Sequence, residues 1–290
     1  MDTPQTDEIN PRVLLAVLAH PDDETFGMGG TLARYAHQGV KVYLACATRG
    51  EVGEMDPRYM QGFSSIGERR ESELRCAAEK LGLSEVFFFD YRDSGMPGSP
   101  DNTHPQALAF QPLDQVAADV VHLIRLLKPQ VVLTFDPIGG YRHPDHIAIH
   151  QATVRAFELA RDASFSPGDG TPFQPQRLFF HTIPHGYLKV GVRLLRLFGR
   201  DPRKFGQNGD IDLVSIAEVS FPTHAAIDYR SVAKLRDEAS ACHASQGGKQ
   251  MTGGILGWVR RLFNSRDSFM QAYPPPTDKN IISDLFAGVI

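Results

Sequence analysis

An apolar run that ends in an acidic cluster is the feature that most constrains the fold of this chain. Residues 13–19 are all apolar, which is typical of a parallel strand buried on both faces of a sheet. The segment His20-Pro-Asp-Asp-Glu24 follows directly and therefore lies at the carboxyl end of that strand. Open α/β sheets bind their ligands at this end of their strands. The sequence thus predicts an α/β fold with a polar site after its first strand.

The acidic cluster indicates a bound cation. Its three carboxylates repel one another unless a cation or strong hydrogen-bond donors neutralise them. A divalent metal would do this with His20 and Asp23 as ligands, which leaves Asp22 as a base toward a bound water. A solvated turn after an edge strand is the alternative interpretation of the segment.

A second polar cluster follows another short apolar run, residues 131–135. Pro144 suits the first turn of a helix, where its missing N–H is not needed. His143 and His146 are then three residues apart and can face the same side of that helix. The second cluster therefore offers imidazole ligands next to the end of a strand.

His146 is predicted to complete a metal site with His20 and Asp23. A fourth position stays open for water in this arrangement, as in catalytic zinc sites, and Fe²⁺ also accepts two histidines and one carboxylate. His150 lies four residues beyond His146 and offers a competing ligand pair, which would place the metal one turn deeper in the helix.

Two motifs in these clusters resemble those of a known family. Ala19-His-Pro-Asp-Asp-Glu24 and Gly140-Tyr-Arg-His-Pro-Asp-His146 are similar to the paired motifs of the zinc-dependent de-N-acetylases of the PIG-L/LmbE family. That family includes deacetylases of N-acetylglucosaminyl-phosphatidylinositol and of the precursors of mycothiol and bacillithiol. The resemblance covers residues 12–160 well and 214–246 loosely. Supporting matches are Arg70-Glu-Ser-Glu73, Asp93-Ser-Gly-Met96 and His243-Ala-Ser-Gln246.

The resemblance implies hydrolysis of an N-acetyl group on an N-acetylglucosamine-type conjugate. In this reaction Asp22 is expected to be the general base toward a metal-bound water. His143 is expected to be a protonated imidazole that stabilises the oxyanion and protonates the amine, with Asp145 favouring its charge. The family implies Tyr141 as the group that polarises the carbonyl. Other carboxylates are expected to orient the ligands or the base, or else to cap turns: Asp136, Glu24 and Asp93.

Sugar recognition needs charge-assisted donors, and three arginines are candidates by position: Arg70, Arg49 and Arg92. Arg70 has the best match to the family. An amidase for larger thiol or sugar amide conjugates is the alternative function. A metal-dependent phosphoesterase is less favoured because it usually needs more carboxylates to bridge two ions.

The order of apolar and amphipathic segments predicts a Rossmann-like three-layer fold with a mostly parallel sheet. Leu32 interrupts a dinucleotide-binding glycine motif, so a nucleotide cofactor is excluded. A loop is expected at 163–176. The predicted strands are 13–19, 40–47, 85–90, 130–135 and 177–182, and the predicted helices are 27–38, 66–82, 112–128 and 144–162.

Composition restricts the partners and the compartment. A net charge of −4 without a basic stripe argues against nucleic acid. The N-terminus lacks a signal peptide and no window of 18 residues is apolar throughout, so a cytoplasmic protein is expected. Three scattered cysteines predict neither a disulfide framework nor a cysteine zinc site, and Cys46 and Cys76 are expected to be core residues.

A single domain over 1–290 is predicted, with a lid or oligomerisation insertion at 185–213 and a C-terminal extension at 247–290. Two basic amphipathic stretches, 188–198 and 255–263, expose apolar side chains. A homo-oligomer that covers them is favoured over a membrane surface.

Overall fold

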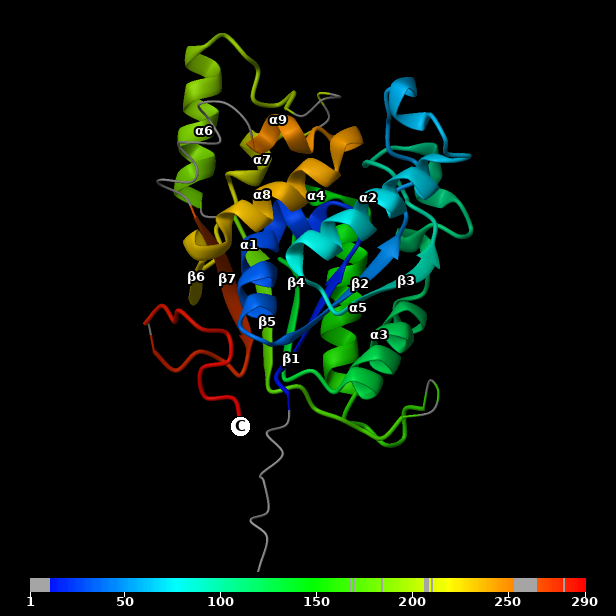
Figure 1. The fold of residues 1–290 in the computed structure, drawn as a ribbon, viewed down its shortest axis with the longest axis vertical. Coiled ribbons are helices and arrows are strands. Elements are labelled where there is room, and N and C mark those ends of the chain that lie inside the picture. The colour runs from blue at the N-terminus through cyan, green and yellow to red at the C-terminus, as the bar shows by residue number, and fades with distance from the viewer. Residues whose placement is uncertain are drawn as a thin grey trace, which may run out of the picture.

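The computed structural model describes residues 11–166, 168, 170–183, 185–205, 209, 211–252, 265–278 and 280–290. Its centre is a seven-stranded sheet in the order β3-β2-β1-β4-β5-β7-β6 (Figure 1). The first five strands in this order run parallel, and β7 pairs antiparallel with both β5 and β6. The strands are β1 Val13–Leu18, β2 Lys41–Thr48, β3 Glu85–Tyr91, β4 Val131–Phe135, β5 Arg177–Thr182, β6 Ala225–Asp228 and β7 Arg266–Tyr273.

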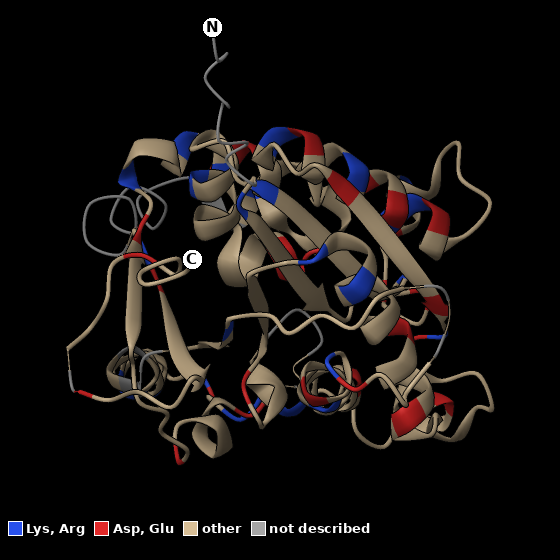
Figure 2. Ribbon diagram, turned by 90° about the horizontal axis from the view of Figure 1, so that it is seen from below, with Lys and Arg blue, Asp and Glu red and all other residues tan. Residues whose placement is uncertain are grey.

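Helices cover both faces of this sheet, as the view from below shows (Figure 2). On one side α1 Asp23–His37 and α2 Ile66–Leu81 pack with α8 Ala233–Cys242, and on the other α3 Leu113–Leu127 packs with α5 Pro144–Leu159. The α/β three-layer fold with a mostly parallel sheet is therefore confirmed. The remaining α-helices of the described chain are α4 Gly139–Arg142, α6 His185–Leu197, α7 Leu213–Ile216 and α9 Gly248–Thr252.

The strand β1 lies in the middle of the sheet and is buried along its whole length. It pairs with β2 on one side and with β4 on the other. Because β1 and β4 are adjacent and parallel, their carboxyl ends meet at one edge of the sheet. The two motifs follow these two strands and are brought together there.

The first helix begins earlier than the sequence predicted, at Asp23 rather than at residue 27. The carbonyl of Asp22 already accepts the backbone N–H of Phe26 at 2.8 Å. The glycines on either side of Met28 accompany a kink at that residue inside the helix. As a result, Asp23 and Glu24 lie in the first turn of α1, where the helix dipole favours negative charge.

The prediction that the cysteines form no disulfide was wrong. Cys76 on α2 and Cys242 at the end of α8 are bonded, with a Cα–Cα distance of 5.8 Å. The two residues are 166 positions apart, so only the packing of α2 against α8 reveals the pair. Cys76 is exposed and not a core residue, whereas Cys46 is buried and free as expected.

The segments 185–213 and 247–290, which were predicted as additions to the domain, lie in different parts of the structure. The stretch 188–198 belongs largely to α6, which exposes apolar side chains, while the stretch 255–263 lies outside the described residues. From the C-terminal extension, β7 is inserted between β5 and β6 and is part of the sheet. No described helix combines the length and the apolar character needed to cross a membrane.

Candidate metal centre and catalytic site

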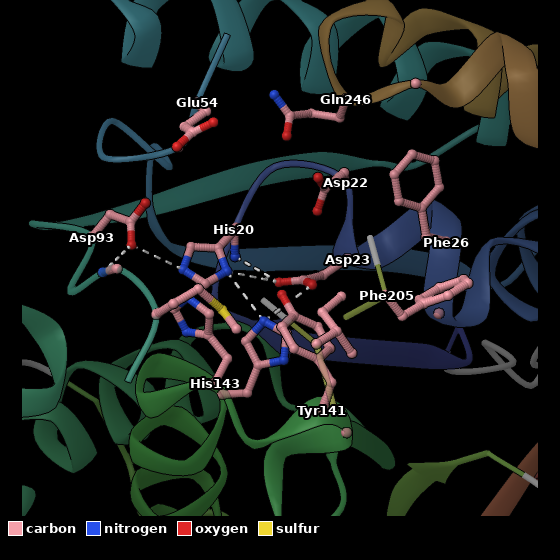
Figure 3. A pocket seen from close by; sticks show the side chains of 18 of the residues that line it. His20, Asp22, Asp23, Phe26, Glu54, Asp93, Tyr141, His143, Phe205 and Gln246 are labelled. Carbon is pink, nitrogen blue, oxygen red and sulfur yellow. Dashed lines mark hydrogen bonds and ion pairs between the residues drawn. The ribbon is translucent and has the colours of Figure 1, made fainter. Parts of the chain in front are cut away.

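A cavity of about 920 Å³ opens at the carboxyl ends of β1 and β4 (Figure 3). Its floor holds both motifs, with His20 and Asp23 from one and His143 and His146 from the other. Its volume lies in the upper part of the range that small-molecule sites occupy. The cavity is therefore large enough for a sugar conjugate.

Three side chains converge on one point of this floor. His20 Nδ1 lies 3.1 Å from His146 Nε2 and 3.6 Å from Asp23 Oδ2. His146 Nε2 lies 3.3 Å from Asp23 Oδ1. Atoms bound to one tetrahedral zinc at about 2.0–2.1 Å are separated by distances of this order. The structure thus brings the three predicted ligands together in a geometry that fits a metal ion.

The hydrogen bonds around the two histidines favour the same assignment. His146 Nδ1 lies 3.2 Å from the carbonyl oxygen of Gly139, so the proton belongs on Nδ1 and the lone pair on Nε2. His20 Nε2 lies 3.1 Å from a carboxylate oxygen of Asp145, which would leave Nδ1 to bind a cation. Although burial opposes protonation, Asp93, Asp145 and Asp23 raise the pKa of His20 well above its ordinary value, so the proton on Nδ1 is the one that a metal would displace. Metal-binding histidines are typically held in this way by a second hydrogen bond. The donor set therefore fits a divalent cation.

The competing ligand His150 does not reach the cluster. Its Nδ1 lies 2.8 Å from the carbonyl oxygen of Phe135, and its ring packs edge-on against Phe180. It is also absent from the residues that line the cavity. His150 acts as a buried structural histidine beneath the site.

Asp22 projects into the cavity beside the three ligands. Burial raises its pKa to about 6; Arg70 works against this rise and the charge of Asp23 adds to it. Arg70 Nη2 donates to Asp22 Oδ2 at 3.0 Å and to the carbonyl of Pro21 at 2.8 Å. Asp22 is thus a carboxylate held close to the proposed metal with a pKa suited to proton transfer near neutral pH.

The surroundings of His143 favour a neutral imidazole over the protonated one that the sequence predicted. Its Nδ1 accepts the backbone N–H of Asp145 at 3.2 Å and caps α5. Burial lowers its pKa well below the ordinary value, and the neighbouring charges of His20 and His146 lower it further. With Nδ1 as an acceptor, the neutral ring carries its proton on Nε2 and offers a hydrogen-bond donor.

Asp145 does not pair with His143 as expected. Its carboxylate is fully buried. It accepts hydrogen bonds from His20 Nε2 at 3.1 Å and from the backbone N–H of Ser94 at 2.9 Å. The hydroxyl of Ser94 also donates to it. Asp145 therefore orients His20, and Ser94 supports it from the Asp93-Ser-Gly-Met96 segment, in which the sequence had given Ser94 no role.

Tyr141 lies against the ligand cluster, with its ring 4.9 Å from that of His146 and 5.9 Å from that of His143. Burial raises the pKa of its phenol well above the ordinary value, and the charges of Asp23 and Asp22 add to this effect. The phenol therefore keeps its proton and can donate a hydrogen bond, as its expected role requires.

The three arginines expected to bind substrate have different places. Arg70 lines the cavity but is buried, and it donates to Asp22, to Pro21 and to the carbonyl of Gly50. Arg49 pairs with Glu71 and Asp90, and Arg92 pairs with Asp101. Neither Arg49 nor Arg92 is among the lining residues, so the structure does not bring them to the site.

The other expected supporting carboxylates are buried around the floor. Asp93 accepts the backbone N–H of Gly95 at 2.8 Å and lies 3.6 Å from His20 Nε2. Asp136 accepts the backbone N–H groups of Ile138 and Gly140, which is the turn-capping role that the sequence left open.

Sequence reasoning missed much of the cavity wall. Glu54 and Gln246 face the floor from its upper rim (Figure 3), and His181 also lines the cavity. A further part of the wall comes from α6 and the chain after it: Leu195, Arg200, Asp201, Lys204, Phe205 and Ile211. These residues belong to the segment predicted as a lid or an oligomerisation insertion. They are far from both motifs in the sequence, and no local pattern marks them.

Comparison with known proteins gives the relatives of this chain. The family model of the GlcNAc-PI de-N-acetylases (PIG-L) matches residues 15–157. A 1D-myo-inositol 2-acetamido-2-deoxy-alpha-D-glucopyranoside deacetylase from Geodermatophilus obscurus is 37% identical over 244 residues, which cover 81% of this chain and 83% of the relative.

Two solved structures share the fold at low sequence identity. The N,N'-diacetylchitobiose deacetylase from Pyrococcus horikoshii has a TM-score of 0.61 and 19% identity, and the match covers 90% of this chain and 84% of that one. The 4-carboxy-2-hydroxymuconate hydratase from Pseudomonas putida KT2440 has a TM-score of 0.60 and 19% identity, over 92% and 98% of the two chains. Because one fold carries both chemistries, these two likenesses describe the fold alone.

Proposed function

This chain belongs to the PIG-L family of metal-dependent N-deacetylases, and on that premise we propose that it removes the acetyl group from an N-acetylglucosamine–inositol conjugate. The relative from Geodermatophilus obscurus is named for this substrate. The convergence of His20, Asp23 and His146 beside Asp22 carries the proposal, because it combines a ligand set with a free carboxylate.

We assign the metal to His20, Asp23 and His146, with zinc as the first choice and Fe²⁺ as the alternative. When bound, such a cation acidifies water and polarises an amide carbonyl. With the metal bound, Asp145 and the Gly139 carbonyl would accept the proton on the other ring nitrogen of His20 and of His146, which would leave His20 Nδ1 and His146 Nε2 as the metal-binding atoms. Although burial opposes ionisation, His146 and His20 lower the pKa of Asp23 well below its usual range, so it is an anionic ligand.

Asp22 accepts the proton of the attacking water in this proposal. Its carboxylate is ionised above about pH 6, and it stays fixed because Arg70 binds one of its oxygens. The departing amine needs one proton, and Asp22 is the group that has just received one. Asp22 thus takes one proton from water and gives one proton to the amine, so the reaction returns it to its starting state.

Tyr141 and His143 stabilise the negative charge that develops on the acetyl oxygen. Both are neutral groups that keep a proton, on the phenol oxygen and on Nε2 respectively. Fixed donors in a buried site stabilise an oxyanion more strongly than water does, because they need no reorganisation.

Acetate release from a panel of acetylated amino sugars tests the proposed function. The metal-reconstituted protein is expected to hydrolyse N-acetylglucosaminyl-inositol faster than the malate and phosphatidylinositol conjugates of the same sugar. Faster hydrolysis of the malate or the phosphatidylinositol conjugate would change the proposed substrate but would still support a deacetylase. No acetate from any of them, with metal bound, would contradict the deacetylase assignment.

A further inference from the structure

We propose that His243, which lies far from both motifs in the sequence, is a positioning residue for this reaction. It acts through Glu24, which holds the backbone of Asp22 in the conformation that points its carboxylate into the cavity. The inference rests on the proposed role of Asp22 as the base. It adds the residue that directly follows α8 to the machinery built by the two motifs.

A single buried carboxylate joins His243 to the base. His243 Nε2 lies 2.7 Å from Glu24 Oε1, and both side chains are fully buried. The other oxygen, Glu24 Oε2, accepts the backbone N–H of Asp22 at 3.0 Å. Among the described residues, Nδ1 of His243 has no hydrogen-bond partner, so the ring makes its one hydrogen bond to Glu24.

The backbone of Asp22 needs such support. Its φ is 121° and its ψ is −27°, a combination that residues with a side chain rarely adopt. A strained conformation persists only where the surrounding structure holds it, and such residues cluster at active sites. Glu24 holds the N–H of this residue, and Arg70 holds its carboxylate and the preceding carbonyl. The loop is thus fixed from two sides.

The hydrogen bond between His243 and Glu24 is not needed merely to anchor the end of α8. The 3-10 turn that begins at Ala244 is already tied to α2, because Glu73 accepts the backbone N–H of Ser245 at 3.0 Å and its hydroxyl at 2.6 Å. That second contact is also buried and does not lead to Asp22; the Ser245 hydroxyl in addition accepts from Gln246 Nε2 at 3.1 Å, so an effect through the cavity rim would change KM and not the base. It therefore provides a matched control for the loss of a buried hydrogen bond in the same turn.

Four variants separate positioning from stability. His243→Phe keeps an aromatic ring but removes the donor to Glu24, and kcat is expected to fall by about 10- to 100-fold, the usual effect of losing a group that orients an active-site residue. KM and metal content are expected to stay unchanged, since no ligand is touched. His243→Gln restores an N–H donor and is expected to recover most of kcat. Ser245→Ala is expected to lower the melting temperature with kcat within about twofold of wild type.

A double variant tests whether His243 acts through the base. Asp22→Asn/His243→Phe is expected to lose no more activity than Asp22→Asn alone, because both changes disable one group. Full activity of His243→Phe beside an inactive Asp22→Asn would overturn this inference and leave the proposed function intact. Equal losses in His243→Phe and Ser245→Ala, or no recovery in His243→Gln, would also overturn it. A fully active Asp22→Asn would instead contradict the proposed role of Asp22.

Discussion

Asp22 and Asp23 are neighbours in the sequence, yet their surroundings give their carboxylates opposite properties. Burial raises the pKa of Asp22 to about 6, whereas His146 and His20 lower that of Asp23 against the effect of burial. Two carboxylates whose pKa values are pushed apart can take different parts in one reaction. One then suits a proton acceptor and the other a permanent anionic ligand.

Replacement of Asp22 by asparagine separates these two parts. Asp22→Asn keeps the size of the side chain and is expected to lower kcat by about 10²- to 10⁴-fold, which is the usual contribution of a general base. Metal content, measured on the purified variant, is expected to match wild type, because the three ligands are untouched. Near wild-type turnover would show that Asp22 is only a neighbour of a ligand.

Two histidines on α5 give a paired test of the metal assignment. His146→Ala is expected to abolish stoichiometric metal binding, because His146 Nε2 lies within 3.3 Å of both His20 Nδ1 and Asp23 Oδ1. His150→Ala is expected to keep the metal and to lose stability, since His150 bonds only to the Phe135 carbonyl within the described residues. Loss of metal in His150→Ala but not in His146→Ala would contradict this assignment and favour a metal bound deeper in α5.

At the level of elements, the closing helix α8 is joined to the rest of the fold in several ways. The disulfide Cys76–Cys242 ties its last residue to α2, and the next residue, His243, bonds to Glu24 on α1. Helices α1, α2 and α8 are therefore linked into one layer. The position of the catalytic loop depends on this layer as well as on the strand that precedes it.

The contribution of the disulfide is measurable. Replacement of both Cys76 and Cys242 by serine is expected to lower the free energy of unfolding by about 2–4 kcal/mol, because the bond closes a long loop in the unfolded chain. Thermal unfolding of wild type with and without reductant checks this value, and the double variant should be insensitive to reductant. Equal stability of the two proteins without reductant would contradict a stabilising bond.

At the scale of the whole molecule, the outer surface of α6 is unusual. Leu197 and Phe198 at its end are 77% and 76% exposed, and Val190 and Leu194 are about half exposed. A cluster of this kind on a water-soluble surface commonly marks an interface. The same segment continues into the cavity wall, so an interface there would lie next to the substrate.

Self-association through α6 stays a prediction, and its measurement is direct. Light scattering on dilute protein is expected to give a multiple of the 32.1 kDa chain mass. Phe198→Asp should shift the population toward the monomer, because it places a charge in the apolar surface. A monomeric wild-type protein that binds anionic liposomes would favour a membrane surface as the partner.

The sequence by itself determined the parallel core of the sheet and the place of the site. Residues 13–19 and 131–135 predict strands through local apolar patterning, and the motifs that follow must meet once those strands pair. The three proposed ligands and Asp22 were therefore predictable, since His20, Asp22 and Asp23 directly follow β1 and His146 lies in the first turn of the helix after β4. Local periodicity carries this information without any knowledge of distant segments.

Tertiary structure alone decided the charge state and the partners of the remaining groups. Asp145 faces His20 and Ser94 instead of His143, and Cys76 bonds to Cys242 across two helices. Tautomers, pKa values and ion pairs depend on atoms within a few ångströms, and those atoms come from segments that the sequence separates widely. The support that His243 gives to Glu24, over 219 residues, follows from the same physics.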